Sequence, residues 1–159
     1  MKKMMLAALM LLCVNEVCLS QLIGNYLGKT KDQIKKELVN KGHNLKTDLD
    51  EFTTNGFLGY GLPGSMVYFN DKGVCFLEYN CVFDRYKAEK MFNTYLYNKS
   101  SFYAYQCTGI LMYDESSNDK INVRYCPNIN SFVSSYEFWA FKSKDINSVN
   151  LFFSLYDKR

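Results

Sequence analysis

The stretch "SMVYFNDKGVCFLEYNCVF", residues 65–83, decides the fold that the sequence predicts. It holds two runs rich in β-branched and aromatic residues, and residues 70–73 between them are typical of a turn. Two such runs joined by a short turn form an antiparallel hairpin. The centre of the chain is therefore predicted to be part of an antiparallel sheet.

A helix is predicted on each side of this hairpin. In "GKTKDQIKKELVNKG", residues 28–42, Thr30 and Gln33 form a capping box, which predicts a helix over 31–41 that ends at Gly42. The second helix is predicted to begin after Asp84 as its cap. Its apolar residues recur at helical spacing: Ala88, Met91, Phe92, Tyr95 and Leu96.

The rest of the chain is predicted to form strands. "FYAYQCTGILMY" (102–113) and "KINVRYC" (120–126) form a second hairpin, "YEFWAF" (136–141) and "VNLFFSLY" (149–156) close the chain, and a weaker strand covers 45–49. The predicted fold class is α+β, an antiparallel sheet with two helices packed on one face. The order of helix and strands occurs twice, which indicates two repeated units, the second beginning near Asp84.

The first residues have the order of a secretory signal peptide. Lys2 and Lys3 precede an apolar run over 4–14, and small residues follow near Ser20. The alternative is a buried N-terminal helix. The apolar run is too short to span a bilayer, and Leu12 before Cys13 does not fit a lipoprotein signal. We expect cleavage after Ser20, a single domain over 21–159, and a protein exported to the periplasm or the extracellular space without a membrane anchor.

The glycines of "GYGLPG", residues 59–64, match the G-x-G-x-x-G pattern of dinucleotide-binding loops. That pattern requires a strand before the glycines and a helix after them, whereas the residues that follow here are "SMVYF", a predicted strand. The surrounding "NGFLGYGLPGS", residues 55–65, is predicted to be a turn-rich loop, and no cofactor is predicted. The 19 basic and 16 acidic residues form no like-charge block, so nucleic acid is not a predicted partner.

Four cysteines follow the predicted signal peptide, and an exported protein favours disulfides. Pairing Ile110 with Val123 and Met112 with Ile121 across the second hairpin sets Cys107 opposite Cys126, which makes these two the predicted disulfide. If 74–83 is one straight strand, Cys75 and Cys81 lie on the same face, about 20 Å apart, too far to pair with each other. The cysteine spacing fits no zinc site, and no metal is predicted.

Two kinds of function remain for these residues. The many aromatic residues, with 13 Tyr and 12 Phe, predict a binding surface. The candidate binding residues are Tyr95, Tyr97, Tyr103, Tyr105 and Trp139. A non-enzymatic protein that binds a protein partner, rather than a small molecule, is the favoured prediction. The alternative is a small secreted hydrolase that uses a cysteine with His43, or carboxylates from 48–51 or from Asp114 and Glu115.

The opening of the first predicted helix, "GKTKDQI", resembles small exported bacterial domains related to β-lactamase-inhibitor protein and to the outer-membrane assembly lipoproteins. The residues that carry the resemblance are Gly28, Thr30, Gln33 and Ile34. The resemblance implies a binder or scaffold without catalytic residues. This chain lacks the lipid-modified cysteine of the assembly lipoproteins, so membrane attachment is not implied.

Overall fold

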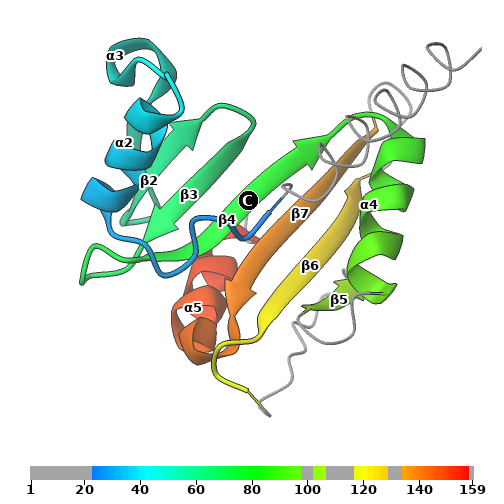
Figure 1. Ribbon diagram of the computed structural model, residues 1–159. Helices are drawn as coiled ribbons and strands as arrows, with labels where there is room; N and C mark the ends of the chain where they lie inside the picture. Colours follow the sequence, from blue (N-terminus) through cyan, green and yellow to red (C-terminus); the bar gives the residue numbers. More distant parts are fainter. Residues whose placement is uncertain (1–22, 98–101, 107–116, 129–133, 158–159) are drawn as a thin grey trace, which may run out of the picture.

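The computed structural model describes residues 23–97, 102–106, 117–128 and 134–157. Their fold is α+β: a seven-stranded sheet with strand order β1-β2-β3-β4-β7-β6-β5 and helices on both of its faces (Figure 1). All neighbouring strands are antiparallel except β5 and β6, which are parallel. The strands are β1 Asp50–Thr54, β2 Phe57–Leu62, β3 Ser65–Phe69, β4 Cys75–Val82, β5 Phe102–Gln106, β6 Ile121–Asn128 and β7 Ser135–Lys142. The helices are α2 Lys31–Asn40, α3 Leu45–Asp48, α4 Arg85–Tyr97, the 3₁₀ turn η1 Ser143–Asp145 and α5 Ile146–Tyr156.

The predicted central hairpin is confirmed as β3 and β4, with a β-bulge that the sequence did not reveal. Tyr68 pairs with Leu77 but Phe69 pairs with Cys75, so Phe76 is the extra residue. The bulge puts Cys75 into the core beneath α2 and α4, whereas Cys81 packs toward α5. The expectation that Cys75 and Cys81 share one face is therefore wrong, because the strand is not straight.

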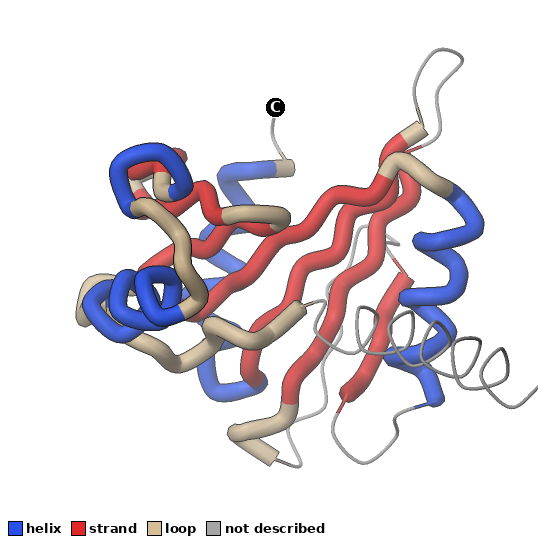
Figure 2. Tube along the Cα trace, turned by 45° about the horizontal axis from the view of Figure 1, so that its top comes forward, coloured by secondary structure: helices blue, strands red, loops and turns tan. Residues whose placement is uncertain are grey.

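Helices α2 and α4 cover the same face of the sheet, as predicted. Figures 1 and 2 show α2 over the β2–β3 end and α4 along the β6–β5 end. Ile34 and Leu38 of α2 and Ala88 and Met91 of α4 are at most 1% exposed, and all four belong to one core cluster with alternate residues of the strands. Burial of these apolar stripes holds both helices on this face.

Helix α5 covers the opposite face with an aromatic core. Phe152 is fully buried, with its ring centroid 4.7 Å from that of Tyr68 and 5.6 Å from that of Trp139. The carboxylate of Glu137 accepts hydrogen bonds from the hydroxyls of Tyr79 and Tyr156 and from Trp139 Nε1, at 3.4–3.5 Å. Many aromatic residues of the chain therefore fill the space between α5 and the sheet, and others belong to the core on the opposite face.

The two predicted helix caps are confirmed. Gln33 N donates to Thr30 Oγ1 at 3.3 Å, and Thr30 N donates to Gln33 Oε1 at 2.8 Å, which completes the capping box of α2. Lys87 N donates to Asp84 Oδ1 at 2.6 Å at the start of α4. Gly42 has a φ of +83° just after α2, a backbone conformation that favours glycine.

Two segments that were predicted to be strands are helices. Residues 149–156 belong to α5, where Ile146, Val149 and Phe152 follow one another at helical spacing and point into the aromatic core. Residues 45–48 form the short helix α3, which Asn44 begins by accepting a hydrogen bond from Lys46 N at 3.0 Å. A strand would place Val149 on the face opposite to Ile146 and Phe152, whereas the helix puts all three on one buried face.

The predicted second hairpin is also wrong in direction. Strand β5 runs parallel to β6, with Phe102 beside Ile121 and Ala104 beside Val123. Because β7 occupies the other side of β6, Val123 and Ile121 have no edge left to pair with residues 110 and 112. Those two residues, like Cys107, lie outside the described residues.

The glycine-rich segment 55–65 is for the most part strand β2 rather than a loop. Gly59 lies opposite Phe52 of β1, and a Cβ added at Gly59 would lie 2.5 Å from Phe52 Cε2. Gly64, with a φ of +83°, turns the chain from β2 into β3. These glycines therefore allow close packing and a tight turn between two strands.

Candidate functional site

A segment preceding α2, residues 23–29, crosses the face of β4 between α2 and α4 (Figures 1 and 2). We call it the strap. Ile23 and Leu27 bury their side chains in the core of this face, at 5% and 7% exposure. Gly28 N donates to Cys75 O at 2.8 Å, and Cys75 N donates to Lys29 O at 2.9 Å. Apolar contacts and backbone hydrogen bonds thus fix the strap on the sheet.

Glu78 of β4 is the buried acid beneath the strap. Its side chain lies on the α2 face, because its neighbours Leu77 and Tyr79 pack toward α5. The residue is 2% exposed, and its Oε2 accepts a hydrogen bond from Tyr26 N at 3.1 Å. Burial raises the pKa of Glu78 to about 7, against the lowering effect of the Tyr26 and Gly24 backbone donors and the Lys29 ammonium. Glu78 is therefore an acid that changes charge near neutral pH.

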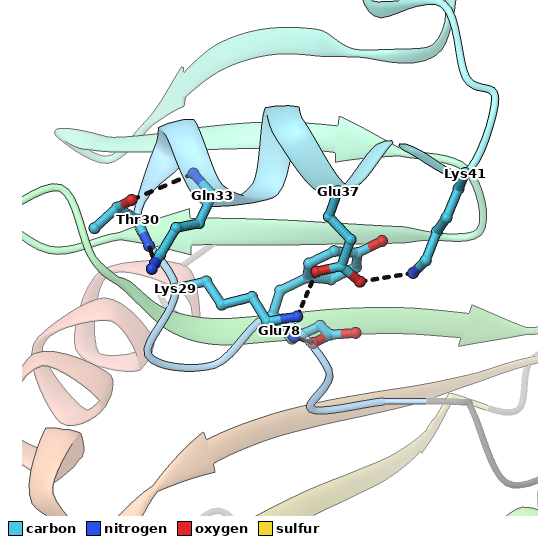
Figure 3. Close-up of polar contacts among 7 residues, drawn as sticks. Lys29, Thr30, Gln33, Glu37, Lys41 and Glu78 are labelled. Atoms are coloured by element: carbon cyan, nitrogen blue, oxygen red, sulfur yellow. Dashed lines mark hydrogen bonds and ion pairs between the residues drawn. The ribbon is translucent and has the colours of Figure 1, made fainter. Parts of the chain in front are cut away.

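Above Glu78, Glu37 of α2 joins two lysines (Figure 3). Its Oε2 accepts a hydrogen bond from Lys29 Nζ, and its Oε1 accepts one from Lys41 Nζ at 2.7 Å. Burial alone would raise the pKa of Glu37, but the hydrogen bonds from the two ammonium groups outweigh it and lower that pKa below its ordinary value. We call Lys29 and Lys41 the lysine clamp, since each holds one oxygen of a single carboxylate.

The ring of Tyr26 lies near both clamp lysines. Lys29 Nζ is 5.4 Å and Lys41 Nζ 5.6 Å from the ring centroid, within the range of cation–π contacts. Burial is the main cause that raises the pKa of the Tyr26 phenol, so the hydroxyl stays protonated at neutral pH. The Tyr26 side chain therefore provides an uncharged aromatic surface beside the clamp.

These groups line an open cleft of about 550 Å³. Its walls come from the strap, α2, the turn between β2 and β3, and β4. The lining residues are Asn25, Tyr26, Lys29, Glu37, Lys41, His43, Pro63, Gly64, Ser65, Glu78 and Asn80. We call this hollow the strap cleft. Its volume lies within the range of ligand sites, and its lining is more polar and charged than that of most such sites, which favours a polar or charged group of a ligand or partner.

The sequence-predicted binding residues lie elsewhere. Trp139 is 1% exposed in the core beneath α5, and Tyr95 is 8% exposed beneath α4. Both side chains pack inside the protein. Tyr97 ends α4, and Tyr103 and Tyr105 belong to β5 at the sheet edge, where their backbones pair with Asn122 and Arg124. The structure does not describe the side chains of these three tyrosines.

The predicted disulfide between Cys107 and Cys126 stays a prediction. Cys107 lies outside the described residues, and the hairpin register on which the pairing was based is replaced by the parallel pairing of β5 with β6. The described cysteines Cys75, Cys81 and Cys126 form no disulfide with one another. The described part of the chain also holds no cluster of three or more His, Cys, Asp or Glu side chains that would bind a metal ion.

The residues of the alternative enzyme are not brought together where they are described. His43 lies with its Nδ1 3.3 Å from Asp48 Oδ2 at the rim of the strap cleft, whereas Cys81 packs toward α5 on the other face. Cys75 is fully buried, and this burial raises the pKa of its thiol. Asp50 and Glu51 are exposed on β1. Asp114 and Glu115 lie outside the described residues.

Sequence reasoning missed the strap cleft for two reasons. Glu78 stands inside an apolar strand, and only the presence of an acid between Leu77 and Tyr79 could have signalled it. Glu37 and Lys41 have the i, i+4 spacing of a helical ion pair, but Lys29 precedes the helix and follows no helical spacing. The tertiary course of the strap brings them together.

Within the described residues, no helix has the length and apolarity needed to cross a bilayer. No family model matches the chain, and searches of the curated proteins and of the solved structures find no match either. The resemblance to β-lactamase-inhibitor protein and the assembly lipoproteins therefore stays a prediction.

Proposed function

We propose that the protein is an exported, non-enzymatic binding protein that holds a protein partner at the strap cleft. The observation that carries this proposal is the cleft itself: about 550 Å³, open to solvent, with the charged side chains of Lys29, Glu37 and Lys41 on its wall. Sites of this kind bind through a few polar groups that are already in position.

Export is part of the proposal and rests on the order of residues 1–20. The described core begins at Ile23, which is 5% exposed, and the strap follows it. Cleavage after Ser20 would therefore leave every described core residue in the mature protein. The periplasm and the extracellular space both fit this proposal.

Affinity capture tests the binding proposal. The tagged mature protein is incubated with cell-envelope and culture fractions of its source, in parallel with S65W, which places a large ring in the strap cleft. Ser65 begins β3 at the β2–β3 turn and lines the cleft. The matched control is S154W, because Ser154 is exposed on α5, on the other face.

We expect a stoichiometric partner with the wild-type protein and with S154W, and its loss with S65W. Capture of the same partner by all three proteins would place the binding surface elsewhere and reject the cleft. Melting temperatures of the three proteins, measured in the same buffer, must agree within a few degrees for the comparison to hold.

A carboxylate hydrolase is the second candidate, because two acids in the strap cleft have pKa values shifted in opposite directions. The pKa of Glu78 is raised to about 7 and that of Glu37 is lowered, as in acid–base pairs of hydrolases. A binding function is favoured over hydrolysis, because both oxygens of Glu37 are hydrogen-bonded to the clamp lysines and Glu78 is only 2% exposed beneath the strap.

Release of reducing sugars from cell-wall polysaccharide tests this candidate. A hydrolase would show turnover that E78Q abolishes. Absence of turnover with the wild-type protein, or equal turnover with E78Q, would remove the carboxylate mechanism.

A further inference from the structure

We propose that the strap cleft receives an acidic side chain of the protein partner, and that this carboxylate replaces Glu37 between Lys29 and Lys41. The inference rests on the proposed binding function and names the chemistry of the partner. In the absence of the partner, the carboxylate of Glu37 occupies the site between Lys29 and Lys41.

The geometry of the lysine clamp is that of a carboxylate receptor. Two ammonium groups from different segments, one from the strap and one from just after α2, each contact one oxygen of the same carboxyl group (Figure 3). Both ammonium groups also lie near the Tyr26 ring, at 5.4 and 5.6 Å from its centroid. A second carboxylate approaching from the cleft meets two positioned donors.

The charge of the cleft favours an anionic group over a cationic one. Each ammonium has three N–H donors, and the contacts with Glu37 use one donor of each clamp lysine, so donors remain for a second carboxylate. The two ammonium groups outnumber the Glu37 carboxylate, and burial of Glu78 favours its neutral form. An amine would meet two ammonium groups of its own sign, whereas a carboxylate would meet the one partly exposed carboxylate of Glu37.

Exchange of Glu37 for an external carboxylate is feasible because the network is solvated. The side chains of Lys29, Glu37 and Lys41 are 35%, 27% and 51% exposed. Ion pairs at such exposure are weak, since water competes for both partners. The capping box and the buried side chains Ile34 and Leu38 hold α2 independently of Glu37, so the helix remains in place when Glu37 is displaced.

Titration with two peptides tests the inference. The probes are capped pentapeptides of sequence Gly-Glu-Glu-Glu-Gly and Gly-Gln-Gln-Gln-Gly, which differ only in charge. Binding is measured at low ionic strength by the amide chemical shifts of Tyr26, Lys29 and Lys41. We expect the Glu peptide to move these amides with saturation and the Gln peptide to leave them unmoved.

Variants of the network give opposite expected changes. K41M and K29M should each weaken binding of the Glu peptide by up to about fivefold, because each removes one donor and one charge. E37Q should strengthen it by up to about fivefold, because the competing carboxylate is gone. The matched control is K36M, which changes net charge equally but lies on α2 outside the cleft lining, and it should change binding less than about twofold.

A gain with E37Q cannot come from misfolding, so this variant keeps the test sharp. Equal binding of the two peptides, or equal losses with K36M and K41M, would overturn the inference by reducing it to general charge attraction. If S65W abolishes partner capture but E37Q and K41M leave it unchanged, the inference fails while the binding proposal stands. If S65W leaves capture unchanged, the binding proposal fails first.

Discussion

The two faces of the sheet bury their polar groups in different ways. On the α5 face, the partly buried Glu137 carboxylate accepts hydrogen bonds from the phenol groups of Tyr79 and Tyr156 and from the indole of Trp139, beside a dense aromatic core. On the α2 face, the ion network of Lys29, Glu37 and Lys41 borders an open cleft. The first arrangement stabilises the fold, and the second is available to a partner. Aromatic content alone therefore does not locate a binding surface in this protein.

The largest expected effect on stability comes from disrupting the aromatic packing on the α5 face. Phe152→Ala removes the ring that packs against Tyr68, Phe76 and Trp139, and it should lower the free energy of unfolding by about 3–5 kcal/mol. Urea denaturation measures this. Leu155→Ala, at a side chain 38% exposed on the same helix, is the control and should cost less than about 1 kcal/mol. Similar losses of unfolding free energy for both variants would mean that the buried aromatic contacts of Phe152 are not what holds α5 on the sheet.

The second effect tests the buried acid of the α2 face through pH. Burial raises the pKa of Glu78 to about 7 from its ordinary value of 4.5, so the folded protein keeps a proton that the unfolded chain has already lost. This contribution to stability is fully present below pH 4.5 and is lost as the pH rises through 7. Its full size is on the order of 3 kcal/mol.

The E78Q variant isolates this contribution, because Gln is nearly isosteric with the protonated acid but does not ionise. As the pH rises from 4.5 to 8, the urea concentration at the midpoint of unfolding should fall for the wild-type protein relative to E78Q. Near pH 4.5 the two proteins should have similar midpoints. A constant difference across this range would contradict a raised pKa for Glu78.

A smaller effect concerns the edge of the α5 face, where β2 meets β1. Gly59→Ala should cost about 1–2 kcal/mol, because the new Cβ would lie 2.5 Å from Phe52 Cε2 and the Phe52 ring packs edge-on against Tyr68. Gly61→Ala, with its Cβ 3.4 Å from Asp50 Cβ, is the matched control and should cost less. Thermal unfolding of the two variants decides the point, and equal losses would show that the cost arises from strand glycine replacement in general.

The smallest effect sharpens the account of how α2 is held. Thr30→Ala removes the cap of α2 and should cost about 1 kcal/mol. Gln33→Ala removes only the reciprocal bond to Thr30 N and should cost less. Both are measured by urea denaturation. A loss for Thr30→Ala as large as that for Phe152→Ala would mean that the cap, and not burial of Ile34 and Leu38, fixes α2 on the sheet.

Local signals in the sequence were sufficient for the parts of the fold that depend on local contacts. The capping box at Thr30 and Gln33 predicted α2, Asp84 predicted the start of α4, and the turn at residues 70–73 predicted the β3–β4 hairpin. In each case the decisive hydrogen bonds join residues a few positions apart, so the sequence carries the whole signal.

Non-local packing decided the rest. Residues 149–156 include the consecutive apolar side chains Leu151, Phe152 and Phe153, which are typical of a strand, whereas the spacing of Ile146, Val149 and Phe152 already fits a helix. The parallel pairing of β5 with β6 depends on where β7 inserts, which no local pattern records. The strap cleft joins residues from position 25 to position 80, so only the folded chain defines it.

The most direct test of the central claim is amide chemical-shift mapping of the mature protein with its captured partner. The predicted result is a set of perturbed amides confined to the strap, residues 37–41 at the end of α2 and the β2–β3 turn, with those of α5 unchanged. Perturbations concentrated on α5, or on β5 and the end of α4 near Tyr97, Tyr103 and Tyr105, would contradict the claim and move the binding surface to that part of the molecule.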